Sequence, residues 1–155
     1  MGEALKQRLK QSKFESPEQE AFLNIIVTAN FLRMRNDDIL CKYGITTPLY
    51  NVLRILKGKY PEGYPRCDII SRMMEQAPDV TRLIDKLLKD GYVERFESES
   101  DRRLSLTRIT EKGLALLEKI KPELDQMHRL ISDNLTKEER KELSVLLEKI
   151  YAQSV

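Results

Sequence analysis

The sequence predicts a mainly α-helical protein with one small β-hairpin. Apolar side chains recur with helical spacing in both terminal stretches and in a short segment before Gly91, while two short runs after Gly91 read as strands around a polar tip. The 155 residues fit one domain or one compact subunit. With 41% hydrophobic and 34% charged residues and no tryptophan, each long helix is expected to bury a single stripe.

The N-terminal third is expected to contain one long helix. Residues 1–15 are polar, with apolar side chains at roughly helical spacing, and indicate a short helix or an arm. Ser16 can serve as an N-cap and Pro17 as the first helical residue, because proline lacks the N–H that is unpaired there. Gln19 can complete a capping box, so the helix should start here and reach about Lys42.

A shorter helix is expected from Thr47 to Gly58. Its buried face consists of Leu49, Val52, Leu53 and Leu56. The next segment, 59–66, contains two prolines and a glycine and is predicted to be a loop. Asp68 can then cap a third helix over 69–75.

The fourth helix is the element around which the chain is organised. Pro78 can occupy its first position, and Gly91 can take the left-handed position after its end. One apolar stripe runs along it: Val80, Leu83, Ile84, Leu87 and Leu88. The opposite face is polar: Asp79, Arg82, Asp85, Lys86 and Lys89. A short helix followed across a tight turn by such a helix is the helix-turn-helix pattern, whose second helix can enter the major groove of DNA.

The C-terminal half is expected to contain two strands and two helices. The strands are predicted at about 92–96 and 103–109, with a solvated tip between them. Thr110 should cap a long helix to about Asn134 that Pro122 kinks. Thr136 and Glu139 form a capping box for a last helix to about Tyr151, with an apolar stripe at Leu143, Leu146, Leu147 and Ile150.

These residues carry a family resemblance. VTRLIDKLLKDGYVER, followed by DRRLSLTRITEKG, resembles the winged-helix core of MarR-family transcription regulators. The Asp101 and Arg103 pair and the closing Ile109, Thr110 and Gly113 keep the spacing of that family. GITTPLYNVLRIL resembles its second helix, so the resemblance covers most of the chain.

The resemblance implies a winged helix-turn-helix with a helical dimerisation layer from both termini. It divides the chain into 1–45, the N-terminal part of that layer, 46–110, the DNA-binding domain, and 111–155, the C-terminal helices of the layer. The apolar stripes of the terminal helices exceed what one small winged helix can cover, which favours a homodimer. Packing of the same helices within one chain is the alternative.

The implied activity is transcriptional regulation, most simply repression, by binding a pseudo-palindromic site in double-stranded DNA. The candidate DNA-binding residues of the helix-turn-helix and the wing are Gln76, Pro78, Asp79, Thr81, Arg82, Lys86, Ser100, Arg102 and Arg103. Arg103 can enter the minor groove or hold the wing to the domain through Asp101, Asp85 or Asp79.

The charge balance of this region favours a rival interpretation. Residues 62–112 contain ten Arg or Lys and eleven Asp or Glu, whereas nucleic-acid domains usually have a basic surface. The candidate cations can therefore be ordinary solvated charges on a winged helix that binds proteins and not DNA. Binding measured over a range of salt concentrations distinguishes the two, because phosphate contacts release counterions.

The resemblance also implies a small aromatic or anionic effector bound between the dimer layer and the winged helix. Arg33, Tyr50 and Arg54 could line such a crevice, or serve structural roles. Cys41 lies near the end of the first long helix, whereas the peroxide-sensing members place their cysteine near its start. Nothing near Cys41 in sequence clearly activates a thiolate, so Cys41 is interpreted as a core or interface thiol, and neither Cys41 nor Cys67 is expected to respond to peroxide.

Other classes of function are not supported by the sequence. The single histidine, His128, and two scattered cysteines supply no catalytic constellation, no structural zinc site and no other metal site. No phosphate-binding glycine loop is present, so neither an enzyme nor a cofactor is expected. The lack of a long apolar run, of a secretory signal and of a disulfide framework indicates a cytoplasmic protein.

Overall fold

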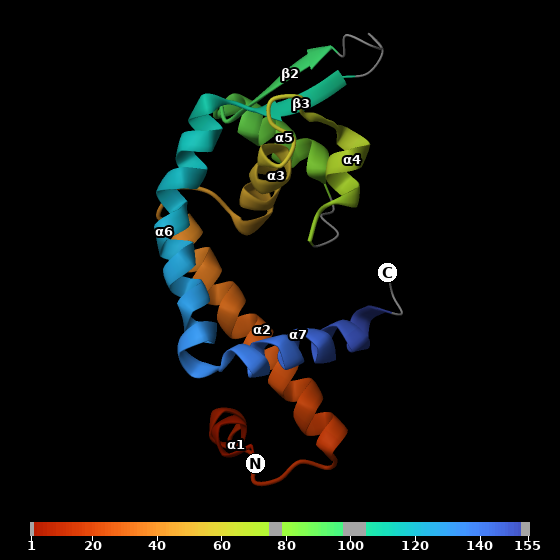
Figure 1. Ribbon diagram of the computed structural model, residues 1–155, viewed down its shortest axis with the longest axis vertical. Helices are drawn as coiled ribbons and strands as arrows, with labels where there is room; N and C mark the ends of the chain where they lie inside the picture. Colours follow the sequence, from red (N-terminus) through yellow and green to blue (C-terminus); the bar gives the residue numbers. More distant parts are fainter. Residues whose placement is uncertain (1, 75–78, 98–104, 153–155) are drawn as a thin grey trace. The chain divides into compact units, whose positions relative to one another are not determined.

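The computed structural model describes residues 2–74, 79–97 and 105–152 and divides into two compact units, Met1–Asp38 and Ile39–Val155 (Figure 1). The predictions for the wing tip, for residues 75–78 and for the start of the second strand lie outside the described residues. The described chain is mainly helical with one three-stranded antiparallel sheet, as the fold class predicted, although the sheet has one strand more than the expected hairpin.

The first unit contains two helices, α1 (Glu3–Leu9) and most of α2 (Pro17–Cys41). Pro17 opens α2 as predicted, and the backbone N–H of Gln19 donates to Oγ of Ser16 over 3.2 Å. The return bond differs from a capping box, because the Gln19 side chain accepts from the N–H of Glu15 over 2.8 Å. Several large apolar side chains of this unit are exposed: Leu9, Phe22, Ile26, Phe31 and Met34.

The second unit holds the main core, to which every later helix except α7 contributes. The buried face of α3 (Thr47–Lys57) packs on α4 (Arg66–Ser71), α5 (Val80–Lys89), β3 (Ser105–Ile109) and α6 (Glu111–Asn134). The predicted stripe of α3 is buried throughout, since Val52, Leu53 and Leu56 are inaccessible to solvent and Leu49 is nearly so. The core therefore holds the apolar face of α5 and leaves its polar face exposed.

The sheet has the order β1–β3–β2, where β1 is Tyr64–Pro65 and β2 is Val93–Glu97. Val93 pairs with Ile109 and Tyr64 with Thr107 in antiparallel register. The prediction of a plain loop over 59–66 was wrong, because β1 adds an edge strand to β3. A two-residue strand is too short to show alternation, and proline is tolerated at a sheet edge because it cannot donate to the ladder.

Two helix starts also differ from prediction. The helix expected over 69–75 is α4, which spans Arg66–Ser71, and Asp68 lies in its first turn, not at its N-cap. The helix expected to start at Pro78 is α5, which begins at Val80 with Asp79 as N-cap. Asp68 lies three residues after Pro65, the N-cap of α4, and Pro78 lies one residue before Asp79, the N-cap of α5.

The two C-terminal helices match their predicted limits. Thr110 caps α6 by accepting from the N–H of Gly113, and the helix continues through Pro122. Thr136 and Glu139 form the predicted capping box of α7 (Lys137–Tyr151). The predicted apolar stripe of α7 is exposed in the single chain at each position: Leu143, Leu146, Leu147 and Ile150.

Candidate DNA-binding surface and effector pocket

Helix α5 presents a polar outer face that is held from behind by a buried apolar face. Val80, Ile84 and Leu87 are almost fully buried, and the N-cap Asp79 accepts through Oδ1 from the N–H of Arg82 over 3.0 Å. The Arg82 side chain is 88% exposed, so the first turn of α5 carries a cation that projects into solvent. A helix anchored in this way can enter a groove without rearranging the core.

Two of the three cations of the outer face, Arg82 and Lys86, are paired with carboxylates. Nε of Arg82 lies 3.2 Å from Oδ2 of Asp79, and Nζ of Lys86 lies 2.9 Å from Oδ2 of Asp90. The third carboxylate, Asp85, accepts from Arg95 of β2 over 2.8 Å and so joins α5 to the wing. Asp79 and Asp85 were two of the three acidic partners considered for Arg103, which lies outside the described residues.

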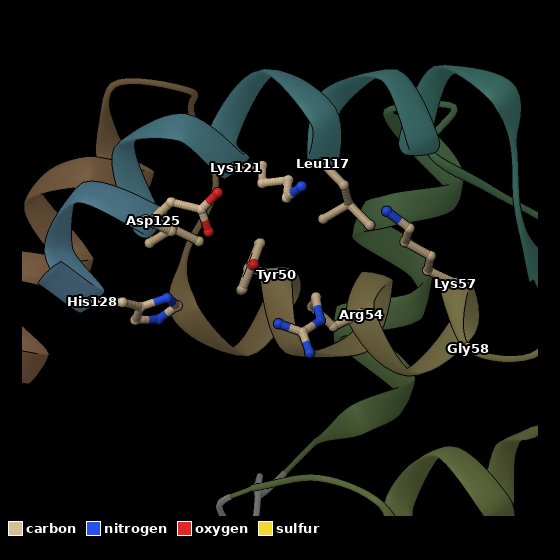
Figure 2. A pocket seen from close by; sticks show the side chains of 9 residues that line it. Tyr50, Arg54, Lys57, Gly58, Leu117, Lys121, Asp125 and His128 are labelled. Carbon is tan, nitrogen blue, oxygen red and sulfur yellow. The ribbon is translucent and has the colours of Figure 1, made fainter. Parts of the chain in front are cut away.

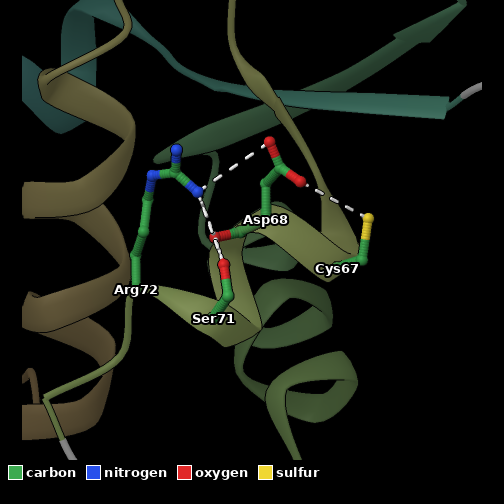
Figure 3. Close-up of polar contacts among 4 residues, drawn as sticks. All are labelled: Cys67, Asp68, Ser71 and Arg72. Carbon is green, nitrogen blue, oxygen red and sulfur yellow. Dashed lines mark hydrogen bonds and ion pairs between the residues drawn. The ribbon is translucent and has the colours of Figure 1, made fainter. Parts of the chain in front are cut away.

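Helix α4 supports α5 through side chains. NH1 of Arg66 donates to the hydroxyl of Thr81 over 3.0 Å, which engages one of the predicted DNA-binding residues. Figure 3 shows Arg72 turned back over its own helix, where NH1 donates to the carbonyl of Asp68 and to the hydroxyl of Ser71. The Arg72 guanidinium also lies 4.5 Å from the ring centre of Tyr64, which ties α4 to β1.

The base of the wing is fixed at the end of α5. Gly91 has φ of 75°, the left-handed conformation predicted for it, and its carbonyl accepts from the hydroxyl of Thr110 over 2.8 Å. On the sheet, Arg108 donates to Glu94 over 2.7 Å and lies 4.6 Å from the ring centre of Phe96. The wing therefore leaves the domain in a defined direction.

The predicted DNA-binding residues fall into two groups. Asp79, Thr81, Arg82 and Lys86 are described, and all four lie on the N-terminal two turns of α5 or at its cap. The others lie outside the described residues: Gln76, Pro78, Ser100, Arg102 and Arg103. The contribution of all nine residues to DNA binding stays a prediction.

A cavity of about 390 Å³ lies between α3 and α6 within the second unit. Figure 2 shows Tyr50, Arg54 and Lys57 on α3 opposite Leu117 and Lys121 on α6. The remaining lining residues are Gly58, Leu124, Asp125 and His128. Tyr50 and Arg54 are two of the three residues predicted for an effector; the third, Arg33, lies on α2 in the first unit and stays a prediction.

The polar lining of the cavity has an excess of unpaired cations. Lys57 donates to Glu118 over 2.7 Å, and this hydrogen bond lowers the pKa of the Glu118 carboxyl. Within the described part of the chain, neither Arg54 nor Lys121 forms a hydrogen bond or an ion pair through its side chain. His128, to which the sequence analysis assigned no site, lies in the lining and is exposed. No local pattern in the sequence indicates that these residues converge, because α3 and α6 are far apart in the chain.

Polar contacts near the middle of α6 join this helix to the start of the second unit. Lys42 and the hydroxyl of Tyr43 both donate to Glu123, and these hydrogen bonds lower the pKa of the Glu123 carboxyl. The same contact with Glu123 raises the pKa of Tyr43. At the N-terminal end of α6, Tyr60 donates to Glu111 over 2.6 Å. These contacts join the N-terminal end and the middle of α6 to the segments that follow and precede α3.

Other kinds of site find no support in the described residues. Cys41 and Cys67 are free and exposed, and the Cys67 thiol lies 3.6 Å from Oδ1 of Asp68. Among residues 2–74, 79–97 and 105–152, no group of three or more His, Cys, Asp or Glu side chains is placed to hold a metal ion. In the same part of the chain, none of the helices has the length and apolar character needed to cross a membrane.

The fold and the α5 surface together define a winged helix-turn-helix protein. The family model described as MarR family matches residues 45–105, which include α3, α4, α5 and β2. The HTH-type transcriptional regulator BilQ of Clostridium symbiosum is 32% identical over 112 residues, which cover 72% of this chain and 76% of BilQ. The chain belongs to the MarR family of DNA-binding transcriptional regulators, which are not enzymes.

Other relatives extend the likeness over nearly the whole chain. The transcriptional repressor MprA of Escherichia coli is 28% identical over 151 residues, 94% of this chain and 85% of MprA. The fold resembles that of MepR from S. aureus in a complex with DNA, with a TM-score of 0.74, 21% identity, and coverage of 86% and 96% of the two chains. It also resembles CouR of Rhodococcus jostii bound to p-coumaroyl-CoA, with a TM-score of 0.75, 20% identity, and coverage of 88% and 95%.

Proposed function

We propose that the protein is a dimeric repressor whose α5 helices read the two halves of a pseudo-palindromic operator. The observation that carries the proposal is the exposed N-terminal half of α5, where Arg82 projects from a capped and buried helix. Helix-turn-helix proteins place this part of the second helix against the base edges of the major groove. Repression is also what the name of MprA states for that relative.

The proposed interface comprises the residues predicted from the sequence. On the helix-turn-helix they are Gln76, Pro78, Asp79, Thr81, Arg82 and Lys86, and on the wing Ser100, Arg102 and Arg103. Arg82 is assigned to base edges or the phosphates beside them. Arg103 is assigned to the minor groove, where the pattern of hydrogen-bond donors and acceptors distinguishes base pairs poorly. MepR, which has the same fold, has been crystallised with DNA.

The decisive experiment compares Arg82→Ala with the parent on the DNA upstream of the gene and on a scrambled duplex. If Arg82 contacts bases, the variant should lose about 1–3 kcal/mol on the cognate duplex and discriminate less. Arg103→Ala should weaken both duplexes more equally and reduce the salt slope by about one unit. Arg129→Ala, which removes an exposed arginine of α6, is the control. Parent-like binding by both variants would contradict the assigned roles.

The proposed dimer uses helices from both termini, in the layer formed by 1–45 and 111–155. Its support is the apolar surface left exposed in each unit, by Phe22 and Met34 on α2 and by Leu146 and Ile150 on α7. Exposed apolar patches on this scale commonly mark interfaces. A two-fold dimer places two recognition helices about one turn of DNA apart, so footprinting should show two protected half-sites. A single saturated half-site would contradict it.

The cavity between α3 and α6 is proposed as the effector site. Its volume of about 390 Å³ lies in the range that small ligands occupy. Arg54 and Lys121 outnumber the one carboxylate of the lining, Asp125, and together with the ring of Tyr50 and the buried Leu117 they suit a small aromatic anion. Because α3 also packs on α5, a ligand that separates α3 from α6 can alter the position of α5. CouR, with the same fold, has been crystallised with p-coumaroyl-CoA.

The effector proposal is tested by titrating benzoate and 4-hydroxybenzoate, with benzamide as the neutral counterpart. Release of the protein from DNA by the acids, but not by benzamide, is expected, and Arg54→Gln and Lys121→Gln should weaken it about tenfold or more, since a charge-assisted hydrogen bond contributes roughly 1.5–3 kcal/mol. Lys119→Gln removes an exposed lysine of α6 that does not line the cavity and is the control. Equal effects of acids and amide, or no effect of either variant, would contradict this site.

The rival function is a winged helix that binds proteins and has no affinity for DNA. The near-equal number of cations and carboxylates over residues 62–112 favours it. The salt titration separates the two, because DNA affinity that depends on phosphate contacts falls steeply as salt rises. A cytoplasmic location is proposed with either function.

A further inference from the structure

The charge arrangement of α5 is unusual for a helix proposed to bind a polyanion. From its N-cap to its C-cap, α5 has three cations and three carboxylates: Arg82, Lys86, Lys89, Asp79, Asp85 and Asp90. All of these side chains except Asp90, which is half-buried, are exposed. The helix therefore brings no net charge to DNA, although its outer face is rich in charged groups.

The two cations of the proposed interface each have a carboxylate of the same helix within ion-pair distance. Asp79 lies 3.2 Å from Arg82 at the N-terminal end, and Asp90 lies 2.9 Å from Lys86 at the C-terminal end. Both side chains of each pair face solvent at least in part, with Arg82 88% and Lys86 54% exposed. A phosphate that approaches either cation therefore meets a carboxylate that already neutralises part of its charge and repels the phosphate.

Helix stability does not explain the second pair. A carboxylate at the C-terminus of a helix opposes the helix dipole, and Asp90 is the C-cap of α5. In addition, a lysine four residues before an acid is the less favourable order for an i, i+4 pair. Asp79 does serve the helix as its N-cap, but asparagine caps equally well without a charge. Both positions thus carry a negative charge that the fold does not require.

Resting on the DNA-binding function proposed above, we infer that Asp79 and Asp90 set sequence selectivity by competing with DNA phosphates for Arg82 and Lys86. On non-cognate DNA, these cations can gain only phosphate contacts, and the carboxylates already supply equivalent partners. On the cognate site, base-edge hydrogen bonds and close fit compensate for breaking the pairs. The carboxylates therefore weaken non-specific binding more than specific binding, which is the difference that defines selectivity.

The test uses the full-length protein with Asp79→Asn and Asp90→Asn, singly and combined, on cognate and scrambled duplexes at several salt concentrations. Asparagine keeps the N-cap at position 79 and the approximate shape at both. The matched control is Asp133→Asn, which removes the same charge from an exposed position near the end of α6. Light scattering verifies that every variant keeps the oligomeric state of the parent.

Each single variant should bind the scrambled duplex about 1.5- to 5-fold more tightly, which is the effect expected from one exposed ion pair. The two sites are roughly 16 Å apart along the helix, so their effects should multiply in the double variant. Affinity for the cognate duplex should rise less, and the salt slope on scrambled DNA should steepen by about one unit for each freed cation. The control should change neither the ratio of affinities nor the slope.

Three outcomes would overturn the inference. Unchanged scrambled-DNA affinity and salt slope would mean that the carboxylates do not compete with phosphates. Weaker binding of both duplexes would mean that the pairs hold the cations in their binding positions. Loss of cognate binding alone in Asp79→Asn would make Asp79 a direct reader of a base, such as the cytosine amino group. Failure of the parent to bind either duplex would instead refute the proposed function itself.

Discussion

The N-cap of α5 gives a stability prediction whose size follows from the structure. Replacing Asp79 by alanine removes the carboxylate that accepts from the N–H of Arg82 over 3.0 Å. Loss of an N-cap of this kind typically costs about 1 kcal/mol. The ion pair with Arg82 adds at most about 0.5 kcal/mol, because the arginine is 88% exposed and solvent screens the pair. We therefore expect Asp79→Ala to lower the free energy of unfolding by about 1–1.5 kcal/mol.

Asp79→Asn separates the contribution of the capping hydrogen bond from that of the negative charge. Asparagine can accept the same hydrogen bond, so this variant should lose about 0.5 kcal/mol or less. Urea unfolding followed by circular dichroism, at one fixed protein concentration, measures both values. In thermal unfolding, the alanine variant should melt roughly 3–6 °C below the parent. If alanine and asparagine destabilise equally, the side chain acts through its charge and the capping argument fails.

Three further predictions follow from the terminal helix, the α6 contacts and the cysteines. Deletion from Thr136 onward should give monomeric or aggregated protein, and a folded dimer of that truncation in light scattering would contradict the proposed layer. Because the hydrogen bond from Lys42 lowers the pKa of Glu123 below its usual 4.5, that contact stabilises the fold above pH 4.5 and is lost as the pH falls through the lowered pKa. Glu123→Gln should therefore lose less stability than the parent between about pH 5 and pH 3 in urea unfolding. Cys41→Ser and Cys67→Ser should leave DNA binding and its response to mild peroxide unchanged in gel shifts; peroxide-driven release that disappears in either variant would show a redox role.

The sequence was most informative where a structural signal is local. Gly91 was predicted in the left-handed position after α5 and has φ of 75°. The capping box of Thr136 and Glu139 and the cap at Thr110 lie where the motifs placed them. Each of these features depends on groups no more than five residues apart in the chain. The spacing of residues in the sequence is enough to predict such contacts, so no knowledge of the tertiary structure is needed.

The sequence was less informative where contacts between residues far apart in the chain determine the local structure. β1 exists because Tyr64 and Pro65 pair with Thr107 and Leu106, more than forty residues away. The same pairing brings Pro65 to the N-cap of α4, which therefore starts at Arg66, ahead of the more obvious cap at Asp68. Local preference favoured a loop and a later helix. The hydrogen bonds of the sheet edge outweigh that preference.

The effector cavity shows why periodicity identifies a buried face better than it identifies a site. The apolar pattern of α3 correctly predicted that Val52, Leu53 and Leu56 face the core. The cavity is lined instead by residues at the margin of that face, among them Tyr50 and Arg54, together with Lys121 of α6. Residues at such a margin have the same helical spacing whether they face solvent or a second helix. Their role depends on how closely α6 approaches α3 in the folded chain, where Glu111 and Glu123 of α6 contact the segments beside α3.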